Sequence, residues 1–158
     1  MHTQRIPEGF EQPSRLDRTI LVDHLLAEGR PLAEYEIGRE VSVPGDVSIA
    51  LRHLRAARLV HRWNDLVTPS LAAVRFLEVM QPADADLAFL EGRRDQSVLE
   101  TLLHEEDGAP ISEPALTNDE EPAVEALERL DAAGLVDRRA GLVAATEPAR
   151  RFAHLLTL

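Results

Sequence analysis

The sequence predicts a mainly helical α+β protein with small β-hairpins, built from two tandem repeats of one unit. Three observations lead to this prediction. A stretch of about one fifth of the chain recurs further along it. Within each copy, the spacing of apolar residues changes from the helical period of about 3.6 to the strand period of about 2. A hydrophobic content of 44% with 28% charged residues is typical of a globular chain.

The internal repeat is visible in the second half of each copy. Residues 47–80 and 123–156 align without a gap and are identical at 13 of 34 positions. The matching residues of the first copy are Ala50, Leu51, Leu54, Ala56, Ala57, Leu59, Val60, Arg62, Leu66, Val67, Ala73, Arg75 and Phe76. Upstream, ILVDHLL (20–26) resembles SVLETLL (97–103) at a slightly different offset, as loop insertions would produce. We interpret the chain as a tandem duplication.

The repeat sets the expected domain boundaries. Residues 15–80 form the first repeat and residues 93–158 the second. Residues 1–14 have no apolar stretch of the kind found in a signal peptide, and we expect a disordered tail there. Residues 81–92 are expected to join the repeats as a linker with a short helix.

Each repeat is expected to contain three helices, a hairpin and a final helix. The expected elements of the first repeat are a helix opened by a capping box at Ser14 and Asp17, a short helix over 33–41, a helix from Val47 to about Arg58 capped by Asp46, strands over 59–63 and 66–68, and a helix to Met80. Asn64 and Asp65 suit the two-residue turn of the hairpin. Three short helices cannot enclose a core alone, and the hairpin would close the open side.

Composition excludes several classes of function. The chain has no Cys, no GxSxG motif, no glycine-rich phosphate loop, and no histidines spaced as metal ligands among His24, His53, His61 and His104. We therefore expect neither an enzyme nor a metal or other cofactor. No apolar run reaches the roughly 20 residues of a membrane span. All 17 basic residues are Arg, which suggests a GC-rich bacterial genome and, with the rest, a soluble cytoplasmic protein.

The hairpin region resembles a known protein family. Residues 50–76, ALRHLRAARLVHRWNDLVTPSLAAVRF, and residues 125–152, EALERLDAAGLVDRRAGLVAATEPARRF, resemble the third helix, wing and following helix of bacterial winged helix-turn-helix transcriptional regulators. The resemblance implies two tandem winged-helix domains. It also implies that the third helix enters the DNA major groove while the hairpin, or wing, approaches the backbone or the minor groove.

The two third helices differ in charge. In the first repeat the face directed away from the core, together with the wing, carries the candidate DNA-binding residues Ser48, Ile49, Arg52, His53, Arg55, Arg62 and Trp63. The helix positions among these correspond to Val124, Glu125, Glu128, Arg129 and Asp131 in the second repeat. Residues 1–80 hold 10 Arg and 11 acidic residues, whereas residues 81–158 hold 7 Arg and 17 acidic residues. We expect double-stranded DNA to bind the first repeat and the second to mediate assembly.

A second hypothesis comes from a different class of function. Tandem winged-helix pairs also serve as non-enzymatic adaptors that bind proteins, and the net charge of −11 favours this alternative because DNA binding requires a basic face. A protein partner or a second copy would then bind the second repeat or the linker. Leu87, Phe89 and Leu90 make the linker apolar, which suits either packing within the chain or a dimer interface.

Overall fold

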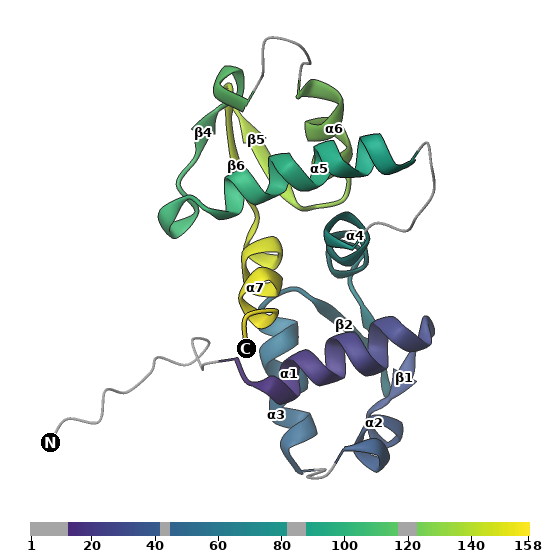
Figure 1. Ribbon diagram of the computed structural model, residues 1–158. Helices are drawn as coiled ribbons and strands as arrows, with labels where there is room; N and C mark the ends of the chain where they lie inside the picture. Colours follow the sequence, from purple (N-terminus) through teal and green to yellow (C-terminus); the bar gives the residue numbers. More distant parts are fainter. Residues whose placement is uncertain (1–12, 42–44, 82–87, 117–122) are drawn as a thin grey trace, which may run out of the picture. The chain divides into compact units, whose positions relative to one another are not determined.

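A computed structural model describes residues 13–41, 45–81, 88–116 and 123–158 of the chain (Figure 1). The chain divides into two compact units. The first unit comprises Met1–Ser70 and His154–Leu158, and the second comprises Leu71–Ala153. Residues 1–12 of the expected tail and Leu87 of the linker lie outside the described residues, as do the side chains of Phe89 and Leu90.

The described part of the chain is a mixed α+β structure with two small antiparallel sheets, which confirms the predicted class at that level. The elements of the first unit are α1 (Arg15–Arg18), which continues as a π-helical segment η1 (Thr19–Leu26), β1 (Leu32–Ala33), α2 (Glu34–Glu40), α3 (Gly45–Ala56), β2 (Val60–Trp63) and β3 (Leu66–Pro69). The second unit contains α4 (Leu71–Met80), α5 (Ala88–Leu103), the 3-10 turns η2 (Glu106–Gly108) and η3 (Glu113–Leu116), β4 (Ile111–Ser112), α6 (Val124–Ala132), β5 (Val136–Arg139), β6 (Leu142–Ala145) and most of α7 (Glu147–Leu155).

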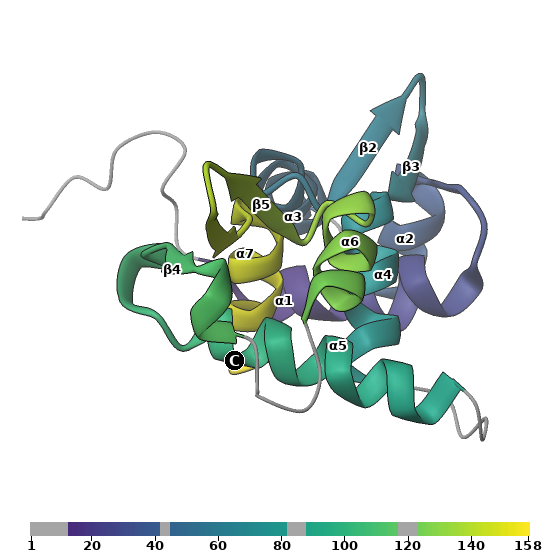
Figure 2. The same cartoon turned by 90° about the horizontal axis from the view of Figure 1, so that it is seen from above.

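The two sheets share one topology and one register. Their strand orders are β1-β3-β2 and β4-β6-β5. In the first sheet Arg62 pairs with Val67, and in the second Arg138 pairs with Val143, which are the positions related by the sequence repeat. Figure 2 shows the β2–β3 hairpin as a projection whose turn lies away from the helices of its unit. The predicted turn is present at Asn64, which has a φ of 54°.

Local sequence accounts for the start of α1. The Ser14 hydroxyl accepts a hydrogen bond from the Asp17 backbone N–H at 3.3 Å, and the Asp17 carboxylate accepts one from the Ser14 N–H at 3.1 Å. This reciprocal pair is the predicted capping box, which satisfies N–H groups that have no partner within the helix. The Asp17 side chain is almost completely buried, so the cap also fixes a carboxylate beneath the surface.

The second repeat departs from the first where the second helix is expected. The first repeat has α2 there, but the described residues after β4 form only the four-residue 3-10 turn η3 before the chain leaves the described part. Residues 117–122 lie outside the described residues. Apart from this and the 3-10 turn η2, which has no counterpart in the first repeat, the described elements follow the same order in the two repeats.

The core of the second unit contains residues from both sequence repeats. Phe76 on α4 and Phe152 on α7 are fully buried, and their rings stack with centroids 4.7 Å apart and planes inclined by 17°. These phenylalanines occupy equivalent positions of the two repeats. The last helix of the first repeat therefore belongs to the second unit, while the last residues of the second repeat, His154–Leu158, belong to the first unit.

No helix among the described residues is both long enough and apolar enough to cross a lipid bilayer.

The ends of α3 and α6 give a matched pair of backbone conformations. Arg58 follows α3 with a φ of 60°, and its equivalent Gly134 follows α6 with a φ of 77°. A side chain in this left-handed region costs about 1 kcal/mol, and glycine avoids the cost. We therefore expect Arg58→Gly to raise the free energy of unfolding by up to about 1 kcal/mol, measured by urea denaturation.

The control for this prediction is Gly134→Ala. It should lower the free energy of unfolding by about 1 kcal/mol. The atom nearest to an added Cβ, the Cβ of Ala72, lies at 3.8 Å, so the alanine side chain meets no clash and the loss comes from the strain of a left-handed backbone alone. If Arg58→Gly proved destabilising, the Arg58 side chain would have a stabilising contact that outweighs its backbone strain.

Candidate nucleic-acid interface

Helix α3 has one buried face and one exposed face. Val47, Ala50, Leu51 and Leu54 lie at helical spacing and are at most 5% exposed, so they anchor the helix to the first unit. On the other side the predicted residues Ser48, Ile49, Arg52 and Arg55 are exposed to solvent. The sequence prediction for this part of the face is therefore reproduced in its geometry.

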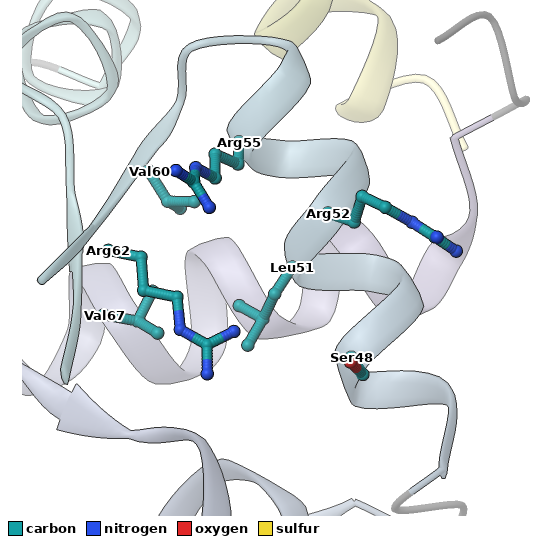
Figure 3. A pocket seen from close by; sticks show the side chains of 7 residues that line it. All are labelled: Ser48, Leu51, Arg52, Arg55, Val60, Arg62 and Val67. Atoms are coloured by element: carbon teal, nitrogen blue, oxygen red, sulfur yellow. The ribbon is translucent and has the colours of Figure 1, made fainter. Parts of the chain in front are cut away.

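A hollow lies between α3 and the β2–β3 hairpin (Figure 3). Its volume is about 250 Å³, and we call it the arginine hollow. It is lined by Ser48, Leu51, Arg52, Arg55, Val60, Arg62 and Val67. In Figure 3 the side chains of Arg55 and Arg62 extend into the space between helix and hairpin, whereas the guanidinium group of Arg52 points away from both.

The three arginines differ in their partners. Arg62 donates a hydrogen bond to the Glu34 carboxylate at 3.0 Å, which ties the hairpin to the start of α2. No ion pair joins Arg52 or Arg55 to another residue in the described part of the chain. Both side chains are exposed on α3, so their positive charges are open to an anionic partner.

His53 has a different place from the rest of the predicted set. Its Nδ1 atom lies 2.9 Å from the Asp17 carboxylate, and its side chain is only 16% exposed. His53 is thus directed at α1 rather than outward with Arg52, because a position next to the apolar stripe points partly toward the neighbouring helix. The sequence analysis placed His53 on the DNA-facing side of the helix. The structure instead shows its side chain in contact with Asp17 of the same unit. We leave His53 out of the interface.

A stability measurement can test this contact of His53. We expect His53→Ala to lower the free energy of unfolding by about 1–3 kcal/mol, because the buried Asp17 carboxylate loses a hydrogen-bond partner. Urea denaturation near neutral pH would measure the change.

The control is His53→Arg, since the second repeat has Arg129 at this position, bound to the Asp95 carboxylate by three hydrogen bonds of 2.8–3.2 Å. We expect His53→Arg to retain more stability than His53→Ala. Equal losses in the two variants would contradict the assigned pairing.

Exposed apolar side chains occur on the same two elements as the arginines. Trp63, in the strand β2, is 74% exposed, and Ile49 on α3 is 43% exposed. Trp63 pairs across the hairpin with Leu66, which is 40% exposed. An isolated exposed apolar residue is ordinary, but these lie on α3, which carries the unpaired Arg52 and Arg55, and on the hairpin, which carries Arg62.

The equivalent surface of the second repeat has the same arginine–glutamate ion pair, but acidic residues replace the two exposed arginines of the helix. Arg138 binds Glu113 at 2.6 Å, as Arg62 binds Glu34 in the first repeat. The positions of Arg52 and Arg55 are taken by Glu128 and Asp131, which are both exposed. One backbone arrangement therefore displays cations on α3 and carboxylates on α6.

Sequence reasoning missed the residues that hold this surface in place. Glu34 and Glu113 each directly follow the first strand of their sheet, and aligning the repeats on that strand would have shown the matched acids. Asp17 and Asp95 likewise lie on the first helix of their repeats, but the match of 20–26 with 97–103 puts Arg94 opposite Asp17, so the repeat gave no signal for this pair. No group of three or more His, Asp or Glu side chains in the described residues is arranged to hold a metal ion.

No protein-family model, curated protein or solved structure matches the chain in the comparisons made.

Proposed function

We propose that the chain is a cytoplasmic DNA-binding transcriptional regulator composed of two tandem winged-helix repeats. In this proposal α3 enters the major groove of double-stranded DNA, and the β2–β3 hairpin serves as the wing near the phosphate backbone. The observation that carries the proposal is the pair of exposed arginines on α3, Arg52 and Arg55, which have no ion-pair partner among the described residues. Their replacement by acids in the second repeat supports proposing this role for the first repeat only.

The chemistry of the exposed face suits both parts of such an interface. Arg52 and Arg55 can bind phosphate oxygens or the paired acceptors of guanine, and the Ser48 hydroxyl can bind either a phosphate or a base edge. Ile49 and Trp63 offer apolar contacts to a thymine methyl group or to sugars. Arg62 lies on the hairpin, where a cation would contact the backbone.

The second repeat has a different role in this proposal. Glu128 and Asp131 on α6 would repel phosphates, so we assign this repeat to assembly with a protein or with a second copy of the chain. Phe89, which was expected in a linker but lies in the first turn of α5, is a further candidate for that contact.

The decisive experiment measures binding of the full chain to a fluorescent duplex of mixed sequence between about 50 and 200 mM salt. Counterion release predicts that log affinity falls linearly with log salt, with a slope of about −0.9 for each phosphate neutralised. Contacts from Arg52, Arg55 and Arg62 therefore predict a slope of about −2 to −3. Absence of binding at about 50 mM salt, where nonspecific affinity is strongest, would refute the proposal.

A second candidate function is a non-enzymatic tandem winged-helix adaptor that binds another protein and not DNA. It is favoured by the net charge of −11 and by the acidic exposed face of α6. The same titration separates the two candidates, because the adaptor predicts no DNA binding at any salt concentration. The exposed carboxylates would then be the first surface to test against a basic protein partner.

A further inference from the structure

We propose that the arginine hollow binds a small organic phosphate, namely a phosphomonoester dianion attached to a compact apolar body. The site would take one such molecule per chain. This inference goes beyond the proposed function and does not rest on it, because the hollow is a property of the first unit alone and can be tested without DNA.

The charge of the hollow favours an anion held between two elements. Arg55 comes from α3 and Arg62 from β2, and both side chains extend into the same space (Figure 3). Two guanidinium groups near one another repel each other, and an anion between them replaces that repulsion by charge-assisted hydrogen bonds. Arg62 is shared with Glu34 at 3.0 Å, but Arg55 has no ion-pair partner among the described residues.

A phosphomonoester fits these donors better than a monoanion. It carries a charge of about −1.5 to −2 at neutral pH and presents three terminal oxygens. Arg55 and Arg62 can each donate two N–H groups, and the Ser48 hydroxyl at the edge of the hollow supplies a further donor. The phosphodiester of a nucleic-acid backbone has one negative charge and two terminal oxygens, so it uses this donor set less fully.

The volume and the apolar lining of the hollow fit a ligand larger than inorganic phosphate. Its volume of about 250 Å³ is a little below the range of roughly 300–1,000 Å³ that is usual for ligand pockets. Its apolar lining consists of Leu51, Val60 and Val67, which are at most 5% exposed and thus fixed by the core beneath. A compact apolar body attached to the phosphate would displace water from this lining, which inorganic phosphate cannot do.

The second repeat provides an internal comparison. There Asp131, on α6, takes the position that Arg55 has on α3. The ion pair of Arg138 with Glu113 corresponds to that of Arg62 with Glu34. An anion at the equivalent position would meet a carboxylate instead of a second guanidinium group. We therefore expect binding at the first repeat only.

The test titrates the purified full chain with phenyl phosphate at fixed ionic strength and follows the fluorescence of Trp63. Trp63 is the only tryptophan of the chain and is adjacent to Arg62, so its emission reports on the hairpin. Inorganic phosphate and benzyl alcohol serve as probes of the head group alone and of the apolar body alone. We expect saturable binding of phenyl phosphate with one site per chain, weaker binding of inorganic phosphate, and no saturable response to benzyl alcohol.

Two variants separate the site from general surface charge. Arg55→Ala should weaken phenyl phosphate binding at least about tenfold, because it removes charge-assisted hydrogen bonds. Arg39→Ala removes the same charge from an exposed position of the same unit that does not line the hollow, so we expect a change below about threefold. Circular dichroism establishes that both variants are folded, as their exposed positions predict.

Several results would overturn the proposal. One is the absence of saturable phenyl phosphate binding by the unmodified chain. Another is an equal loss in Arg39→Ala and Arg55→Ala, which would mean diffuse attraction by the charge of the whole unit. Binding of inorganic phosphate as tight as that of phenyl phosphate would refute the role of the apolar lining. None of these results bears on duplex binding, which the salt titration measures separately.

Discussion

Replacing Phe152 by alanine is expected to lower the free energy of unfolding by about 3–5 kcal/mol. The ring is completely buried in the second unit and stacks on Phe76 with centroids 4.7 Å apart. Truncation removes the apolar transfer energy of the ring and leaves a cavity that the surrounding helices fill only in part. Chemical denaturation followed by circular dichroism would measure the loss.

The matched control is Leu71→Ala. Leu71 lies on α4 with Phe76 but is 56% exposed, so we expect a change within about 0.5 kcal/mol. A double-mutant cycle on Phe76 and Phe152 should show a coupling of about 0.5–1.5 kcal/mol from ring stacking. A loss below about 1 kcal/mol in Phe152→Ala, or strict additivity in the cycle, would contradict the packing described above.

Reversing the charge at Arg52 is expected to weaken duplex DNA binding about ten- to hundredfold at low salt. Arg52→Glu removes a charge-assisted contact, worth about 1.5–3 kcal/mol, and places a carboxylate where the second repeat already has Glu128. The slope of log affinity against log salt should also become shallower by about 0.9. Fluorescence anisotropy over the salt range given above would measure both quantities.

The partner variant in the second repeat is Glu128→Arg. It changes the net charge by the same amount in the opposite direction, at the equivalent position of α6. If the second repeat does not contact the duplex, its affinity should stay close to that of the unmodified chain. Equal and opposite changes in the two variants would show that net charge, not contact by α3, controls binding.

Patterns of near neighbours in the sequence predicted much of the fold. The capping box at Ser14 and Asp17, the hairpin turn at Asn64 and the buried face of α3 around Leu51 and Leu54 depend on spacing over a few residues. The repeat then indicated a second hairpin, which the structure contains in the same register as the first. Local backbone geometry and apolar periodicity are sufficient for such elements.

The candidate site was predictable in part only. Spacing on α3 placed Arg52 and Arg55 outward, because an exposed face follows from the buried one. It misplaced His53, whose contact with Asp17 joins residues 36 positions apart and depends on how two helices pack. The arginine hollow was also missed, since it requires α3 and the hairpin to be placed together in space.

The first unit is discontinuous in the chain, and this has a consequence for its synthesis. Arg18 near its beginning donates hydrogen bonds to the carbonyl oxygens of Leu156 and Leu158, at 3.3 and 2.9 Å. A chain emerging from the ribosome therefore presents α3 and its hairpin long before the residues that complete the same unit are made. The second unit, which is continuous from Leu71 to Ala153, has all of its residues available first. The first unit, although its synthesis begins first, can therefore complete its fold only after the second unit has been synthesised.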